Sequence, residues 1–158
     1  MKRLLHILLS LLLYTGMVQA QGDPLVEALR KYQAGALLEA KGLIDQAVAG
    51  ADHGSNAEAW LLRGFIYKDA YKNATDTTEA DTLRATAINS LRQCMALDTV
   101  GTYKENATQA YDYLAKSYFN DAAKALTAMN DVRAQAVFAS YKEAALVLDP
   151  KADLRTRE

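Results

Sequence analysis

One helical pattern occurs twice in this chain, and it constrains the fold more than any other feature of the sequence. Both copies have a ring, a small residue four positions on and a second ring three further: Trp60, Gly64 and Tyr67, and then Tyr111, Ala115 and Tyr118. Intervals of four and three place side chains along one side of a helix. A small residue between two rings lets a neighbouring helix approach closely. The pattern predicts two helices in equivalent positions, each with a close neighbour.

A second kind of stripe lies between and after these helices. It has a small residue, a large apolar residue four positions on and another small residue three further. Its copies are Ala40, Ile44 and Ala47; Ala87, Leu91 and Cys94; and a looser set of Val137, Tyr141 and Ala145 that runs into Leu148-Asp149-Pro150. The two kinds of stripe alternate, so the chain is an internal repeat of helical pairs.

The distribution of proline and of capping residues also favours helices. Pro24 and Pro150 are the only prolines, and a long stretch without proline favours continuous helix over sheet and turns. Ser55, Asp76 and Thr102 each stand three residues before a glutamate, which is the pattern of a capping box at a helix start. We therefore predict an all-α fold of six helices in three antiparallel pairs.

The first twenty residues have the pattern of a secretory signal peptide. Met1-Lys2-Arg3 is basic, Leu4 to Leu13 is a short apolar run, and Val18-Gln19-Ala20 is a small-residue cleavage site. A membrane anchor, the alternative, needs about 18 or more apolar residues. We expect cleavage after Ala20 and no membrane span in the mature chain.

The mature chain has little that points to a nucleic acid or a membrane surface. Without Lys2 and Arg3 it carries 16 basic and 19 acidic residues, so it lacks the basic patch that either partner requires. Its one cysteine, Cys94, forms no internal disulfide. These features predict export to the periplasm of a Gram-negative bacterium, with a repeat domain at 21–150 and a charged tail at 151–158.

The alternating stripes resemble the tetratricopeptide repeat. The first helix of that repeat carries a ring, a small residue and an aromatic residue at these intervals, and the second often ends in Leu-Asp-Pro, as at 148–150. The resemblance implies about three helical hairpins stacked as a short right-handed solenoid. In the later two pairs the stripes lie about ten residues further apart than in the 34-residue repeat. We expect longer helices or a longer inter-helix loop in both.

Residues that carry catalysis or bind metals are scarce in the sequence. His53 is the only histidine of the mature chain and stands in a glycine-containing loop, where we expect it to be solvated. Asp76, Glu79 and Asp81 could be a calcium site, but their spacing differs from that of an EF-hand loop and helix caps explain them better. We predict a protein that is not an enzyme and has no cofactor, no metal and no catalytic residue.

The resemblance also implies where a partner would bind. In that family, residues one position after the leading ring and one after the small residue line a concave groove. The corresponding residues here are Leu61, Phe65, Asp112 and Lys116, with Leu29 and Tyr32 as further members. An apolar patch beside a charged one suits an extended peptide or a partner helix. The alternative is that the apolar members pack against adjacent helices.

Two functions are consistent with these patterns. The first is a periplasmic adaptor or scaffold that binds a protein or peptide through the groove. The second is a structural protomer, or a fragment of a longer assembly, that self-stacks through its uncapped C-terminal repeat and is a homo-oligomer. Repeat arrays need a polar last helix to close the final apolar face, and the pattern ends soon after Leu148-Asp149-Pro150.

Overall fold

The computed structural model describes residues 22–154, which form six α-helices and no strand. The helices are α2 (Pro24–Gln33), α3 (Leu37–Ala49), α4 (Ala57–Asn73), α5 (Thr77–Leu97), α6 (Lys104–Thr127) and α7 (Asp131–Leu148). The all-α prediction is confirmed for this range. The predicted signal peptide at 1–20 and the second half of the charged tail, 155–158, lie outside the described residues.

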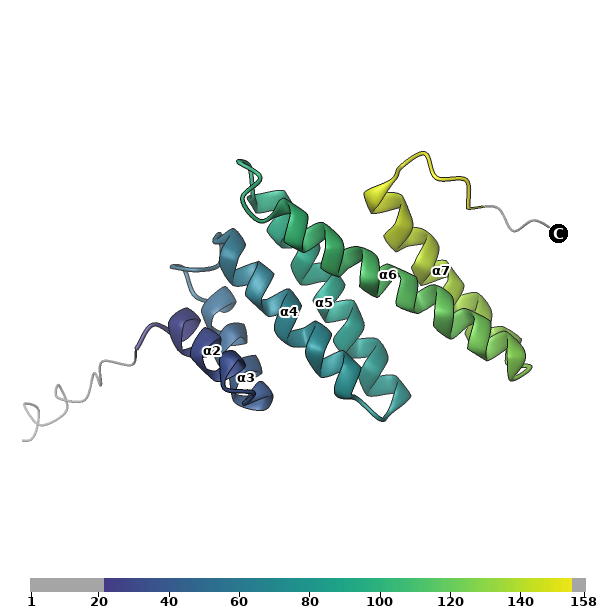
Figure 1. Cartoon of the computed structure of the whole chain (residues 1–158), viewed down its shortest axis with the longest axis horizontal. Helices are drawn as coiled ribbons and strands as arrows, with labels where there is room; N and C mark the ends of the chain where they lie inside the picture. The colour runs from purple at the N-terminus through teal and green to yellow at the C-terminus, as the bar shows by residue number, and fades with distance from the viewer. Residues whose placement is uncertain (1–21, 155–158) are drawn as a thin grey trace, which may run out of the picture.

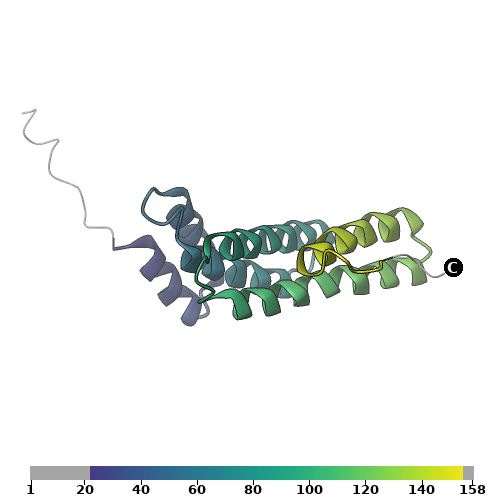
Figure 2. The same cartoon turned by 90° about the horizontal axis from the view of Figure 1, so that it is seen from above.

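Consecutive helices pack in pairs, and the pairs follow one another across the molecule (Figure 1). Contacts are most extensive between α2 and α3, between α4 and α5, and between α6 and α7. The next most extensive contacts join neighbouring pairs, through α3 with α4 and α5 with α6. The first helices also touch one another, α2 with α4 and α4 with α6. In the view of Figure 2, α6 runs along the lower edge of the molecule, and α5 and α7 lie on the upper side of α6.

The extra length of the later pairs lies in the helices and not in the connections. Helices α2 and α3 have 10 and 13 residues, whereas α4, α5, α6 and α7 have 17, 21, 24 and 18. The turns inside the second and third pairs are only residues 74–76 and 128–130. Of the two explanations for the long spacing, the structure selects longer helices. The ends of the second and third pairs therefore extend beyond the first pair (Figure 1).

Side-chain caps begin several of the helices, though not always at the predicted residue. Asp76 caps α5 as predicted, since its carboxylate accepts a backbone N–H at 2.8 Å. Helix α4 is capped by Asn56 and not by Ser55. Helix α6 has no side-chain cap, so the cap predicted at Thr102 is wrong. The carboxylate of Asp98 instead orders the loop before α6, where it accepts the backbone N–H groups of Thr102 and Tyr103 at 2.9 and 2.7 Å.

Most residues of the two repeated stripes are buried, as their spacing predicts. The buried members include Tyr67, Ala87, Leu91, Tyr111, Ala115 and Tyr118. Trp60 is half-buried, and its indole N–H donates to the backbone oxygen of Gly54 at 2.8 Å. The last stripe departs from the pattern. Ala144 is buried where Ala145 was predicted to pack, while Ala145 and Tyr141 are only half-buried and Pro150 is exposed.

Helix α4 contributes to both hydrophobic clusters of the molecule. Leu62 and Ile66 face the smaller cluster with α2 and α3, whereas Leu61 and Tyr67 face the larger cluster with α5, α6 and α7. Gly64 is a point of close approach between α4 and α5. A Cβ atom at this position would lie 2.6 Å from Cδ2 of Leu91, which is inside van der Waals contact.

We predict that Gly64→Ala destabilises the fold and that Gly42→Ala stabilises it. Overpacking against Leu91 costs about 1–3 kcal/mol, and removing a helical glycine regains about 0.5–1 kcal/mol. Gly42 is a matched control, because it is exposed on α3 and its Cβ would meet nothing within 4 Å. Urea unfolding curves of the two variants measure the difference, and a Gly64→Ala protein as stable as Gly42→Ala would refute the close contact.

Candidate functional site

A fully buried arginine, Arg84, lies where the second and third pairs meet. Its guanidinium donates to Asp81 at 2.6 Å, to Asp121 at 2.8 Å and to the hydroxyl of Ser117 at 3.1 Å. It also lies 3.9 Å from the ring centroid of Tyr118. A buried cation needs such partners, because water no longer solvates it.

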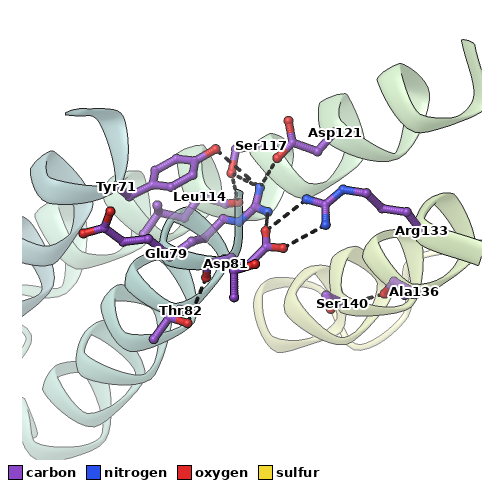
Figure 3. A network of polar contacts seen from close by, with 12 residues as sticks. Tyr71, Glu79, Asp81, Thr82, Leu114, Ser117, Asp121, Arg133, Ala136 and Ser140 are labelled. Carbon is purple, nitrogen blue, oxygen red and sulfur yellow. Dashed lines mark hydrogen bonds and ion pairs between the residues drawn. The ribbon is translucent and has the colours of Figure 1, made fainter. Parts of the chain in front are cut away.

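Helix periodicity places these partners around Arg84. Asp81 lies one turn before Arg84 on α5, and Ser117 and Asp121 lie one turn apart on α6. Asp81 also accepts from Arg133 on α7 at 3.0 Å. Figure 3 shows Asp81 between α5 and the side chain of Arg133, with Ser117 and Asp121 on the facing helix. The network therefore ties three helices together.

The junction between the first and second pairs has a similar composition. Arg63 donates to Asp45 at 2.8 Å and to the hydroxyl of Ser90 at 2.8 Å, and its guanidinium lies 4.7 Å from the ring centroid of Tyr67. The hydroxyl of Tyr67 donates to Asp45 at 2.6 Å. Burial, together with this carboxylate, raises the pKa of Tyr67 to about 12. An arginine, a carboxylate, a serine and a tyrosine ring thus occupy both junctions.

The geometry of the Arg84 network suits a structural tie better than catalysis. The two carboxylates already hold cations, since Asp81 pairs with Arg84 and Arg133, and Asp121 pairs with Arg84 and Lys124. The hydroxyl of Ser117 donates to a backbone carbonyl at 2.6 Å, so its proton is committed within its own helix. Such networks favour one arrangement of the helices over others.

A cleft of about 610 Å³ borders this network, between the turn at 74–76 and the turn at 128–130. Its lining mixes both charges with tyrosine rings and includes Tyr71, Lys72, Tyr113, Asp121, Lys124 and Arg133. The sequence patterns did not predict that these residues come together. They belong to three different helices, and no single helical stripe contains them.

The six predicted groove residues do not form one apolar surface. Leu61 is only 8% exposed and belongs to the larger core, so packing against adjacent helices is its role. Phe65 is half-buried and has the ammonium of Lys68 4.9 Å from its ring centroid. Asp112 and Lys116 are exposed enough to meet a partner but pair with each other at 2.5 Å.

The other two predicted groove residues, Leu29 and Tyr32, lie on α2, which contacts α4. Leu29 is partly exposed. The hydroxyl of Tyr32 donates to Asp69 on α4 at 2.5 Å. Burial and this carboxylate raise the pKa of the Tyr32 hydroxyl, so it remains a proton donor. Tyr32 therefore links α2 to α4 and is committed to that contact.

The structure reveals an apolar groove that the sequence patterns did not predict, at the far face of the third pair. This terminal groove has a volume of about 490 Å³ and is lined by Phe119, Ala123 and Leu126 on α6 and by Ala134, Phe138 and Tyr141 on α7. Its three rings form a cluster with centroids 5.4–6.4 Å apart. Residues 153 and 154 border it. The sequence does contain a pattern that indicates this face, because the apolar residues at 119, 122, 123 and 126 recur at helical spacing.

His53 is less solvated than its loop position predicts. Its Nε2 atom lies 2.8 Å from a carboxylate oxygen of Asp23, and its side chain is only 17% exposed. This contact ties the loop before α4 to the N-cap of α2. Among residues 22–154, no group of three or more histidine, cysteine, aspartate or glutamate side chains is placed to hold a metal ion.

Comparison with protein-family models, with curated proteins and with solved structures finds no match. In the part of the chain from 22 to 154, no helix is both long and apolar enough to cross a bilayer.

We predict that Arg84→Met destabilises the protein by about 1.5–3 kcal/mol, because Asp81, Asp121 and Ser117 lose the hydrogen bonds of a guanidinium that is itself fully buried. Arg133→Met is the matched control at the same aspartate. It removes a side chain that is 33% exposed and should cost no more than about 1 kcal/mol. Chemical unfolding of both variants provides the measurement. Equal losses would mean that Arg84 is not the centre of the junction.

Cys94 should be unreactive in the native protein. Burial, with a contribution from Asp98, raises the pKa of its thiol to about 11, and only the thiolate is nucleophilic. At a pH of about 8, we expect an aromatic disulfide reagent to react about 100-fold more slowly with the folded protein than with the urea-unfolded chain. Similar rates in the two states would contradict a buried thiol.

Proposed function

We propose that this chain is an exported scaffold protein that binds another protein and performs no catalysis. The first support is the resemblance to the tetratricopeptide repeat, which implies hairpins stacked as a short right-handed solenoid. The second is the signal-peptide pattern at 1–20, which implies a periplasmic location. A buried or half-buried arginine beside a tyrosine ring at each junction between successive pairs agrees with stacked pairs.

The observation that carries the proposal is the terminal groove. Phe119 and Leu126 are 50% and 60% exposed along its walls. Contiguous apolar surface of this kind marks sites of protein–protein interaction. The predicted groove on the first helices is a weaker candidate, because Leu61 is buried and Tyr32 is committed to Asp69.

A capture experiment tests the scaffold function. The mature chain and three variants are used as baits for envelope extract, and recovered proteins are quantified by mass spectrometry. Leu126→Glu tests the terminal groove, and a Phe65→Ala, Lys116→Ala double variant tests the first-helix surface. Val100→Ser is the control, because Val100 is 86% exposed in the loop before α6 and lies outside both surfaces.

We expect Leu126→Glu to lower recovery of a specific protein by about tenfold or more, and Val100→Ser to leave it unchanged. A selective loss in the Phe65 and Lys116 variant would instead assign binding to the first-helix surface. Equal recovery by all four baits would refute a scaffold that uses either surface.

Self-stacking is the second candidate function. The specific observation in its favour is that both ends of the row carry exposed apolar side chains, with Val26 and Leu38 on the first pair and Phe119 and Leu126 on the third. Copies joined head to tail would form an open array. Light scattering of the mature protein at increasing concentration separates the two functions, since a strict monomer excludes stacking.

A further inference from the structure

The terminal groove repeats a surface that is covered elsewhere in the same chain. The repeat places α6 and α7 about 50 residues after α4 and α5. Groove residues Ala123 and Ala134 correspond to Lys72 and Arg84 of the second pair, and Phe138 corresponds to Ile88. The terminal groove is therefore the third pair's version of a face on the second pair.

Helix α6 covers that face of the second pair. The ammonium of Lys72 lies 5.3 Å from the ring centroid of Tyr113 on α6. Arg84 donates to Ser117 and Asp121, also on α6. The contacts of α6 with both α4 and α5 agree with this placement. In the second pair, an α-helix of the same chain therefore covers this face.

A single helix covers such a face at both internal junctions. Helix α4 contacts both α2 and α3, and α6 contacts both α4 and α5. The face on the α6–α7 pair has the same two-helix construction. Within residues 22–154, no third helix lines this groove, and the only lining residues outside α6 and α7 are the non-helical residues 153 and 154. By this correspondence, the groove is a face of the kind that one helix covers elsewhere in the chain.

The residues that differ between the two faces define the chemistry of the occupant. Where the second pair has the buried Arg84, the third has Ala134, which is buried and apolar. A carboxylate such as that of Asp121 would find no cation at this position, so the centre of the groove requires apolar side chains. At the edge, the ammonium of Lys142 lies 5.5 Å from the ring centroid of Phe138. The positive charge of Lys142 therefore flanks the ring of Phe138, and the acidic side chain of Asp153 borders the groove as well.

We propose that the terminal groove binds one amphipathic α-helix of a partner protein, in the position that α6 takes on the α4–α5 pair. The helix presents an apolar stripe at intervals of three and four to the groove. It carries acidic residues along the flank that meets Lys142. This inference rests on the proposed scaffold function and names the partner of one surface.

The lengths of the helices favour a partner over a second copy of this chain. The helices that cover internal faces, α4 and α6, have 17 and 24 residues. A copy that continued the row would present α2, which has 10 residues. The exposed side of α2 also carries the ion pair of Glu27 and Arg30, whereas Ala134 and the rings make the centre of the groove apolar.

A peptide-binding assay tests the proposal. The probe is a fluorescent synthetic helix of about 18 residues, or five turns, with leucines in one stripe and glutamates on one flank. The comparison peptide has the same composition with its leucines distributed around the helix. Fluorescence polarisation with the full mature chain measures both. We expect saturable binding of the striped peptide, about tenfold or more tighter than that of the comparison peptide.

Two surface variants of the protein locate the binding. Leu126→Glu places a charge in the groove at a residue that is 60% exposed, so the fold tolerates it. It should weaken binding of the striped peptide about tenfold or more. Leu146→Glu is the matched control, because Leu146 is 43% exposed on α7 and lies outside the groove. It should bind as the wild type does. Circular dichroism verifies that both variants are folded.

Equal binding of the two peptides, or equal binding by the two variants, would overturn the proposal. A wild-type dimer in light scattering that Leu126→Glu converts to monomer would also overturn it, because a second copy would then fill the groove. Failure of the peptide assay leaves the scaffold function standing if envelope capture still depends on Phe65 and Lys116. The two proposals therefore fail separately.

Discussion

The close approach of α4 and α5 at Gly64 is the constraint on which the rest of the structure depends. Leu91 occupies the space that a side chain at position 64 would take. This contact holds α4 against α5, while the opposite side of α4 packs on the first pair. The third pair then builds on the face that α4 and α5 form jointly. A larger residue at one position would therefore disturb contacts on both sides of α4.

Polar side chains add specificity to this apolar framework. Small alanines dominate the core, and small side chains alone would permit neighbouring helices to slide past one another. Arg63 and Arg84 reduce that freedom, because each must meet a carboxylate and a serine while its guanidinium lies on a tyrosine ring. A shift of one helix along its neighbour would break several of these contacts at once. Burying a guanidinium costs desolvation free energy, but its directional hydrogen bonds favour one arrangement of the pairs.

The sequence predicted the elements of this fold better than it predicted its surfaces. Gly64, Leu91 and Asp76 act within one helix or one pair, and local spacing was sufficient to assign them. The partners of Arg84 lie as far as 37 residues away, and the pairing of Arg133 with Asp81 spans 52 residues. No local pattern encodes such contacts. Leu61 shows the same limit, since whether an apolar helical residue lines a groove or a core depends on which helix lies opposite.

The membership of α4 in both hydrophobic clusters has a consequence for how the molecule opens. A helical pair at the end of a row has one neighbouring pair, so it can open locally at a lower free energy than the whole molecule. The first pair is short, and it is held by the smaller hydrophobic cluster and by the hydrogen bonds of Asp45 with Arg63 and Tyr67. When it detaches, Leu62 and Ile66 on the back of α4 become exposed to water while the larger cluster stays intact. Partial opening at the N-terminal end would therefore create a new adhesive surface before the protein as a whole unfolds.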